Sequence, residues 1–383
     1  MGPRLPGTAR VVHATSLQRR RPLCISTTPY ARAGSTRAGN AGPTGPRPAR
    51  RSRRKKEPHV EDRSRRPRGN AFTREDQQGT FAELAENARA MAETVHALRR
   101  AGWNVVIVHG NGPQVGNLAI QQEEGASVVP ALPLSALGAM TQGQLGSLIS
   151  ISLRQTARAG EDIDVATIVT HVAVASDDPA FDDPRKPIGP FFHGDAVTEA
   201  VETRGWTMVE DSGRGHRRVV PSPKPQAILE AASIRTLADA GVVVVAAGGG
   251  GVPVVDEGNG LAGVDAVIDK DYAAQQLANQ LGADALVLVT GVTNVMVDFG
   301  RPTQRALDEI GVDEVERHLA DGQFPEGSMG PKVRAGIAFL RNGGSTVVVT
   351  TPEFAATALA DDESSRIGTR IVADIVGAPA AEA

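Results

Sequence analysis

The sequence has few aromatic residues, a single cysteine and no long hydrophobic run, and each shortage excludes a class of protein. Phe, Trp and Tyr make up 3% of the 383 residues, which argues against a nucleic-acid surface built on base stacking. Cys24 is the one cysteine, so the chain has neither a disulfide framework nor a cysteine metal site. A reducing, cytoplasmic setting fits this composition. No apolar run reaches the ~18 residues that a membrane-spanning helix needs.

Basic charge is concentrated at the N-terminus. Residues 1–68 contain 18 Lys and Arg against 3 Asp and Glu, whereas the rest of the chain contains 23 basic and 41 acidic residues. This segment is rich in Arg, Pro, Gly and Ser and lacks apolar periodicity, so it cannot bury enough surface to offset the entropy of ordering. We expect residues 1–68 to be disordered. Three origins compete: a transit peptide, a nucleic-acid-binding arm, or sequence that is not native coding sequence, which we favour.

The remainder alternates between helical and strand-like apolar patterns. Strands that are apolar throughout are covered on both faces, so the pattern predicts a three-layer α/β/α sandwich with a mainly parallel central sheet. Residues 176–225 break the rhythm and are interpreted as a small inserted lobe that carries a substrate lid. The expected helices cover about 81–98, 137–158, 226–240, 271–281 and 331–341, and the expected strands 104–109, 165–174, 242–247, 285–290 and 345–350.

Two glycine-rich turns follow predicted strands, where ligands of open α/β sheets bind. Gly110, Asn111 and Gly112 lie in HGNGPQVG, which matches neither a G-x-G-x-x-G fingerprint nor a phosphate loop ending in Gly-Lys-Ser/Thr. The second turn is the run Gly248–Gly251. Glycine lets a backbone approach an anion closely. An ordinary turn and a flexible loop remain the alternatives.

Lysines stand beside these turns in the predicted fold. Lys270 is flanked by two aspartates at a helix start, and Lys332 falls in a first helical turn, where the helix dipole disfavours a cation. Such placement indicates a phosphate partner, although a solvated turn and a surface lysine remain open. The lobe adds Lys186 and Lys224 within basic clusters. No His or Cys spacing indicates zinc, and we expect no residue that holds a metal.

Eight segments, in order along the chain, resemble those of the carbamate kinases, which belong to the amino-acid kinase family. They are HGNGPQVGNLAIQQ, AMTQGQLG, RKPIGPF, EDSGRGHRRVVPSPKP, GGGGVPV, VDAVIDKDYAA, LVLVTGVTNV and EGSMGPK. The similarity runs from about Gly69 to about Val376, so the expected kinase domain is 69–378 with its lobe at about 176–225.

The resemblance implies reversible phosphoryl transfer between carbamoyl phosphate and ADP in arginine catabolism, with ATP/ADP, Mg²⁺ and a homodimer. It implies that Lys186, Lys270 and Lys332 surround the transferred phosphoryl group and that Asp271 orients lysines. The implied substrate-binding residues are Gly69, Asn70, Gly110, Asn111, Gly112, Gly248, Gly249, Gly250, Gly251 and Lys224. The implied nucleotide-binding residues are Thr290, Gly291, Val292, Met329 and Lys332. Three lysines and backbone N–H groups can neutralise a phosphoryl group without a nucleophile or a base.

One departure from the family pattern concerns its first strand, which leads into Gly-Gly-Asn-Ala. Arg68 replaces the first glycine, and residues 58–67 carry charges whose burial would cost several kcal/mol each. The first strand is therefore missing from the sequence pattern, and we expect a chain that folds poorly or is inactive. A degenerate kinase-like protein is the main alternative. Another amino-acid kinase is disfavoured by the lobe around Lys186 and Lys224, and a nicotinamide-dependent oxidoreductase by the lack of a suitable acidic residue.

Overall fold

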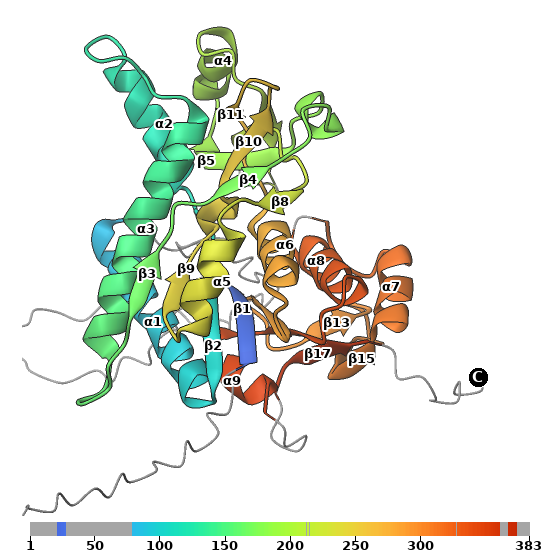
Figure 1. Cartoon of the computed structure of the whole chain (residues 1–383). Helices are drawn as coiled ribbons and strands as arrows, with labels where there is room; N and C mark the ends of the chain where they lie inside the picture. The colour runs from blue at the N-terminus through green and yellow to red at the C-terminus, as the bar shows by residue number, and fades with distance from the viewer. Residues whose placement is uncertain are drawn as a thin grey trace, which may run out of the picture.

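The computed structural model describes residues 21–27, 79–211, 213, 215–326, 328–360 and 367–373, and an eight-stranded sheet forms its centre (Figure 1). All neighbouring strands pair in parallel except β16 and β17. In spatial order the strands are β15 (Glu309–Gly311), β17 (Thr369–Val372), β16 (Thr346–Thr350), β12 (Ala285–Val289), β1 (Arg21–Thr27), β2 (Trp103–His109), β9 (Val243–Val245) and β3 (Val165–Thr167).

Helices cover both faces of this sheet, which confirms the three-layer sandwich and the mainly parallel sheet. One buried cluster joins the sheet to α1 (Phe81–Arg100), α3 (Leu134–Thr156) and α9 (Ala355–Ala358). The opposite cluster joins it to α5 (Ala231–Asp239), α6 (Lys270–Leu281), α7 (Val312–Ala320) and α8 (Met329–Arg341). A capping box of Thr80 and Glu83 starts α1. Its periodic apolar residues from Leu84 to Leu98 are buried as expected, whereas Phe81, the first of the series, is exposed.

Three smaller sheets complete the described part of the chain. A four-stranded sheet has the order β11 (Leu261–Gly263), β10 (Val252–Asp256), β4 (His171–Ala173) and β8 (Ala227–Ile228). A three-stranded sheet consists of β5 (Lys186–Phe192), β7 (His216–Val220) and β6 (Met208–Glu210), beside α4 (Asp195–Glu202). We call this three-stranded sheet with α4 the lobe. The pair β13 (Val295–Val297) and β14 (Arg305–Leu307), α2 (Gln114–Gly125) and the 3-10 turns Pro179–Phe181, Gly248–Gly250 and Pro352–Phe354 make up the rest. None of the described helices is both long and apolar enough to cross a membrane.

The structure corrects the expectation of a missing first strand. Strand β1, within the segment expected to be disordered, lies at the centre of the main sheet and pairs in parallel with β12 and β2. Leu23, Cys24 and Ile25 are fully buried there, because a strand covered on both faces needs apolar side chains rather than one particular sequence. Residues 1–20 and 28–68, including 58–67, lie outside the described residues.

Two other predicted elements have different bounds in the structure. The expected strand 165–174 is two strands, β3 in the main sheet and β4 in the four-stranded sheet. The expected helix 226–240 starts only at Ala231, because β8 precedes it and pairs with β4.

Candidate active site

The two glycine turns lie side by side at the carboxyl ends of β2 and β9. The Gly110 N–H donates to the carbonyl of Thr27 at the end of β1, with an N–O distance of 3.3 Å. A Cβ at Gly249 would lie 2.1 Å from Asn111 Oδ1, and Gly249 has a φ of +68°. Only glycine fits so close an approach in this conformation, so the two turns form one backbone-lined cradle.

Helix α6 begins against this cradle. Asp269 caps the helix, and its Oδ1 accepts a hydrogen bond from the Asp271 N–H at 2.9 Å. A Cβ at Gly110 would lie 3.0 Å from Lys270 Cδ, so the lysine stem runs along the first glycine turn. A Cβ at Gly250 would lie 2.1 Å from the carbonyl oxygen of Ile268, just before the cap. The sequence IDKD and both glycine turns therefore meet at one place.

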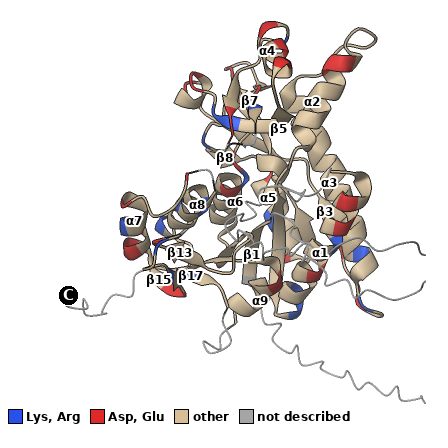
Figure 2. Cartoon of the chain, turned by 180° about the vertical axis from the view of Figure 1, so that it is seen from behind, with Lys and Arg blue, Asp and Glu red and all other residues tan. Residues whose placement is uncertain are grey.

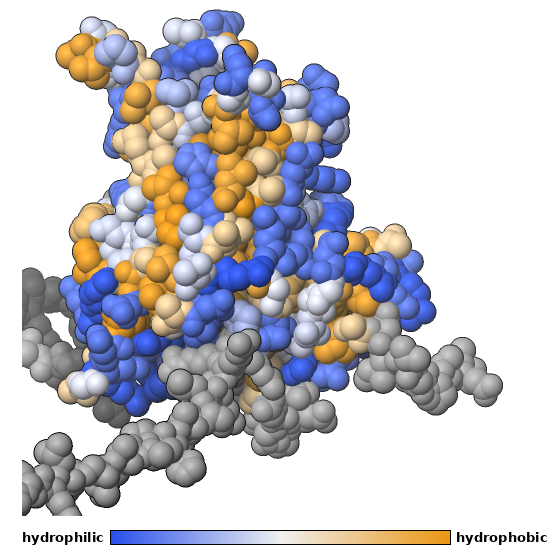
Figure 3. Space-filling model, in the orientation of Figure 1, coloured by the Kyte–Doolittle hydropathy of each residue, from blue (hydrophilic) through white to orange (hydrophobic). Residues whose placement is uncertain are grey.

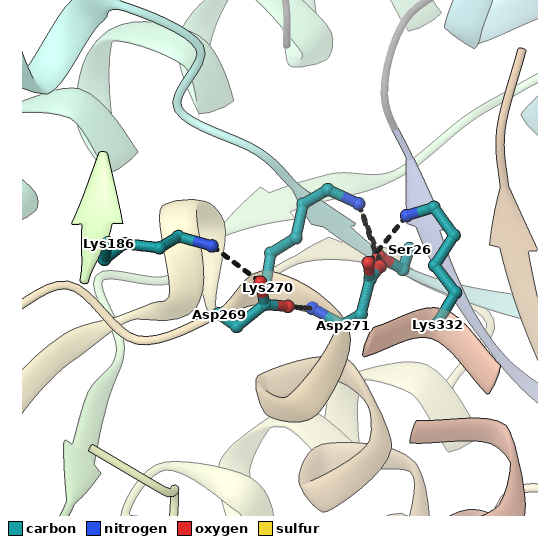
Figure 4. A network of polar contacts seen from close by, with 6 residues as sticks. All are labelled: Ser26, Lys186, Asp269, Lys270, Asp271 and Lys332. Atoms are coloured by element: carbon teal, nitrogen blue, oxygen red, sulfur yellow. Dashed lines mark hydrogen bonds and ion pairs between the residues drawn. The ribbon is translucent and has the colours of Figure 1, made fainter. Parts of the chain in front are cut away.

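Three lysines from separate elements converge on the two carboxylates of this helix start (Figure 4). Asp271 Oδ1 lies 2.9 Å from Lys270 Nζ, and Asp271 Oδ2 lies 2.6 Å from Lys332 Nζ at the start of α8. Lys186 Nζ, on β5 of the lobe, lies 2.6 Å from Asp269 Oδ2. The five charged groups leave a net positive charge beside the glycine cradle, which suits an anion rich in oxygen.

Burial and ion pairing together determine the ionisation of this network. The Asp271 and Lys332 side chains are only 6% and 4% exposed. Burial raises the pKa of Asp271, but the lowering effect of Lys270 and Lys332 is larger, so the pKa lies well below its usual range. Burial lowers the pKa of Lys332, yet Asp271 outweighs this effect and raises it. Burial lowers the pKa of Lys270 to about 8, with Asp271 opposing the change and Lys332 adding to it.

The pKa of Asp269 is lowered, like that of Asp271. Burial raises its pKa, but the Lys186 ammonium outweighs this effect, so the pKa lies below the usual value. Both carboxylates are therefore ionised near neutral pH and hold their lysines in place.

The lobe that carries Lys186 packs closely on α2, the helix that follows the first glycine turn. A Cβ at Gly116 of α2 would lie 2.1 Å from Gly189 Cα of β5. At the other end of α2, Glu123 accepts hydrogen bonds of 3.1 Å from Trp206 Nε1 and Arg204 Nη1. Figure 2 shows acidic positions near this end of α2 and on α4. This junction ties the position of Lys186 to the glycine cradle.

The other predicted site residues differ in where they lie. Lys224 is exposed, and its backbone N–H donates to Asp178 Oδ2 at 2.9 Å. Within the described residues its side chain makes no hydrogen bond or ion pair with the network. Thr290, Gly291 and Val292 follow β12 directly, and Met329 begins the helix that carries Lys332. Gly69 and Asn70 lie outside the described residues.

Sequence reasoning missed two residues at the site. Ser26 on β1 joins the network, because its Oγ lies 2.6 Å from Asp271 Oδ1 and 3.1 Å from Lys270 Nζ. His109, at the end of β2, is fully buried against Gly248, and burial lowers its pKa to about 4. His109 stands directly before the first glycine turn, which could have pointed to it. Ser26 carries no such local signal.

Comparison with known proteins places the chain among kinases. The family model described as "Amino acid kinase family" matches residues 69–351. The carbamate kinase of Thermococcus kodakarensis is 43% identical over 308 residues, which are 79% of this chain and 96% of that protein. The carbamate kinase of Lentilactobacillus hilgardii is 46% identical over 288 residues, 74% of this chain and 89% of that protein. The structure of Giardia lamblia carbamate kinase bound to AMP-PNP superposes with a TM-score of 0.75 at 33% identity, covering 92% of this chain and 99% of that one.

The chain therefore belongs to the amino acid kinase family. Within that family it groups with the carbamate kinases, and it is a phosphotransferase.

Proposed function

We propose that this protein catalyses reversible phosphoryl transfer between carbamoyl phosphate and ADP, giving ATP and carbamate, as in arginine breakdown by the deiminase route. One observation carries the proposal. Lys186, Lys270 and Lys332 reach two linked carboxylates beside a glycine-lined cradle. Phosphoryl transfer requires this kind of charge compensation and alignment, with little covalent chemistry from the protein.

In this proposal the phosphoryl group lies between the lysines and the cradle. The turns at Gly110–Gly112 and Gly248–Gly251 line the site of carbamoyl phosphate. The N–H groups of Gly110, Gly250 and Gly251 donate to carbonyls of the protein, so other N–H groups of the two turns bind the substrate oxygens. Lys270 and Lys332, oriented by Asp271, compensate the charge on the group in transfer, and Lys186 approaches from the lobe. Thr290, Gly291, Val292 and Met329 border the nucleotide, and Lys224 contributes positive charge from the segment after β7.

The nucleotide would carry Mg²⁺ into the site. Asp269 and Asp271 each bind lysines, so neither carboxylate is free to form a metal cage. Mg²⁺ binds readily through nucleotide phosphates and water, and it would neutralise phosphate charge there.

An ATP-formation assay on the full chain tests this function. Purified protein given carbamoyl phosphate, ADP and Mg²⁺ should produce ATP, and Lys332→Met should produce at least about a hundredfold less. Acetyl-glutamate or aspartate with ATP should give no turnover above background. A wild-type chain that binds nucleotide but makes no ATP from carbamoyl phosphate would favour a degenerate kinase instead.

We also propose that two copies associate through the outer face of α3. Met140 and Ile151 are 42% and 49% exposed, and the exposed positions between them, Gly143, Gln144 and Ser147, are uncharged. Figure 3 shows hydrophobic residues over this side of the molecule. Sedimentation should give a dimer for the wild type and a monomer for Ile151→Glu, because a buried carboxylate would lack a partner. A monomeric wild type would contradict this assembly.

A further inference from the structure

Strand β1 contributes a hydroxyl to the charged network although it lies outside residues 69–351, which match the family model. We infer that Ser26 is a positioning residue, which fixes Asp271 and Lys270 in the geometry that phosphoryl transfer requires. This inference rests on the proposed function. It gives a segment outside the family-model match a defined part in the active site.

The chemistry of the contact requires a hydroxyl. Ser26 is fully buried, donates to Asp271 Oδ1 at 2.6 Å and accepts from Lys270 Nζ at 3.1 Å. A hydroxyl both donates and accepts, so one small group can satisfy a carboxylate and an ammonium together. Without it, both charged groups would lose a partner in a buried place, and hydrogen bonds to charged groups are the stronger ones.

The register of β1 determines that Ser26 faces the network. Ser26 pairs with Val108 on β2 and with Leu288 on β12, so ladders on both sides hold the strand. Cys24, on the same face, packs into the cluster that contains α6, whereas Leu23 and Ile25 pack into the opposite cluster. A slip of one residue would turn Ser26 away from α6. The position of the hydroxyl therefore depends on the whole strand.

Lysine NMR tests the inference without relying on enzyme activity. The chain has six lysines, so selective ¹³C labelling gives few signals, and Lys270 is assigned by comparison with Lys270→Arg. In Ser26→Ala the titration midpoint of Lys270 should fall, because its ammonium loses an acceptor, and Ser26→Thr should restore it. Ser150→Ala, which removes a hydroxyl 3.1 Å from Thr167 Oγ1 on the outer side of α3, should leave the midpoint unchanged.

Two further measurements separate failure of this inference from failure of the proposed function. Cys24, fully buried in β1, should react with a thiol reagent far more slowly in folded protein than in denatured protein, in the wild type and in Ser26→Ala. In the ATP-formation assay Ser26→Ala should lower kcat about tenfold or more, with little change in KM. Rapid labelling of wild-type Cys24, or a Lys270 midpoint unmoved in Ser26→Ala, would overturn the inference whether or not ATP is formed.

Discussion

Replacing Asp271 by Asn removes the carboxylate on which the network depends. Asp271 binds Lys270 through Oδ1 and Lys332 through Oδ2, and all three groups are largely buried. Asn keeps the shape and one acceptor but loses the charge, so two cations remain close together without a counterion. Breaking a buried ion pair costs about 3–5 kcal/mol. We expect the free energy of unfolding to fall by about 4 kcal/mol rather than twice that, because Lys270 can release its proton.

The pH dependence makes this prediction specific. Burial lowers the pKa of Lys270 to about 8, and Asp271 is the main group that opposes this change. In Asp271→Asn that pKa should fall further. When the pKa of a lysine is lower in the folded state than in the unfolded state, the free energy of unfolding of the protein rises as pH rises between the two pKa values. The stability gap between variant and wild type should therefore narrow as pH rises from about 6 to 8, and the alkaline limb of kcat should move to lower pH.

Urea unfolding monitored at several pH values, together with the ATP-formation assay, measures both effects. Asp239→Asn is the matched control, because Asp239 is exposed on α5, and it should change stability by less than about 0.5 kcal/mol. If Asp271→Asn unfolds like this control and keeps the wild-type alkaline limb of kcat, then Asp271 does not hold Lys270 and Lys332 in place.

Two more predictions concern the junction between α2 and the lobe. Gly116→Ala should lower the free energy of unfolding by about 1–3 kcal/mol and reduce kcat, since its Cβ would overlap Gly189 and push away the strand that carries a site lysine. Gly138→Ala on α3, with open space around its Cβ, should be neutral or stabilising in the same urea titration. Glu123→Gln should cost at most about 1 kcal/mol, because Glu123 and Arg204 are both partly exposed, but should raise KM by loosening the lobe. Glu124→Gln, 68% exposed, should leave KM unchanged, and equal KM values for the two variants would refute this role.

The parts of the molecule that the sequence predicts correctly depend on local signals. The apolar period of α1, the uninterrupted apolar run of β12 and the glycine turns each indicate their own structure. The prediction of one strand over 165–174 was wrong, because this apolar stretch contributes β3 to the main sheet and β4 to the four-stranded sheet. The Thr170 N–H donates to the Gln142 side chain. The Thr170 carbonyl accepts from Gln142 Nε2 and from the Val252 N–H of β10, and the Thr170 hydroxyl accepts from the Ala247 N–H. Those partners are distant in sequence, so composition could not place the bend between β3 and β4.

The central strand shows the same limit more strongly. Arginine and proline are abundant in the N-terminal segment, so its average composition predicts disorder. The position between β2 and β12 is nevertheless filled by a strand of only 7 residues, β1. Leu23, Cys24 and Ile25 supply apolar volume on both faces, and Pro22, near the start, still accepts from Asp284 N–H. A buried central strand position requires side chains of suitable size and polarity rather than particular amino acids. Successive side chains of β1 point to opposite faces of the sheet, so Ser26 faces the ion pairs on the same side as Cys24. The register of the strand therefore determines that Ser26 is a site residue.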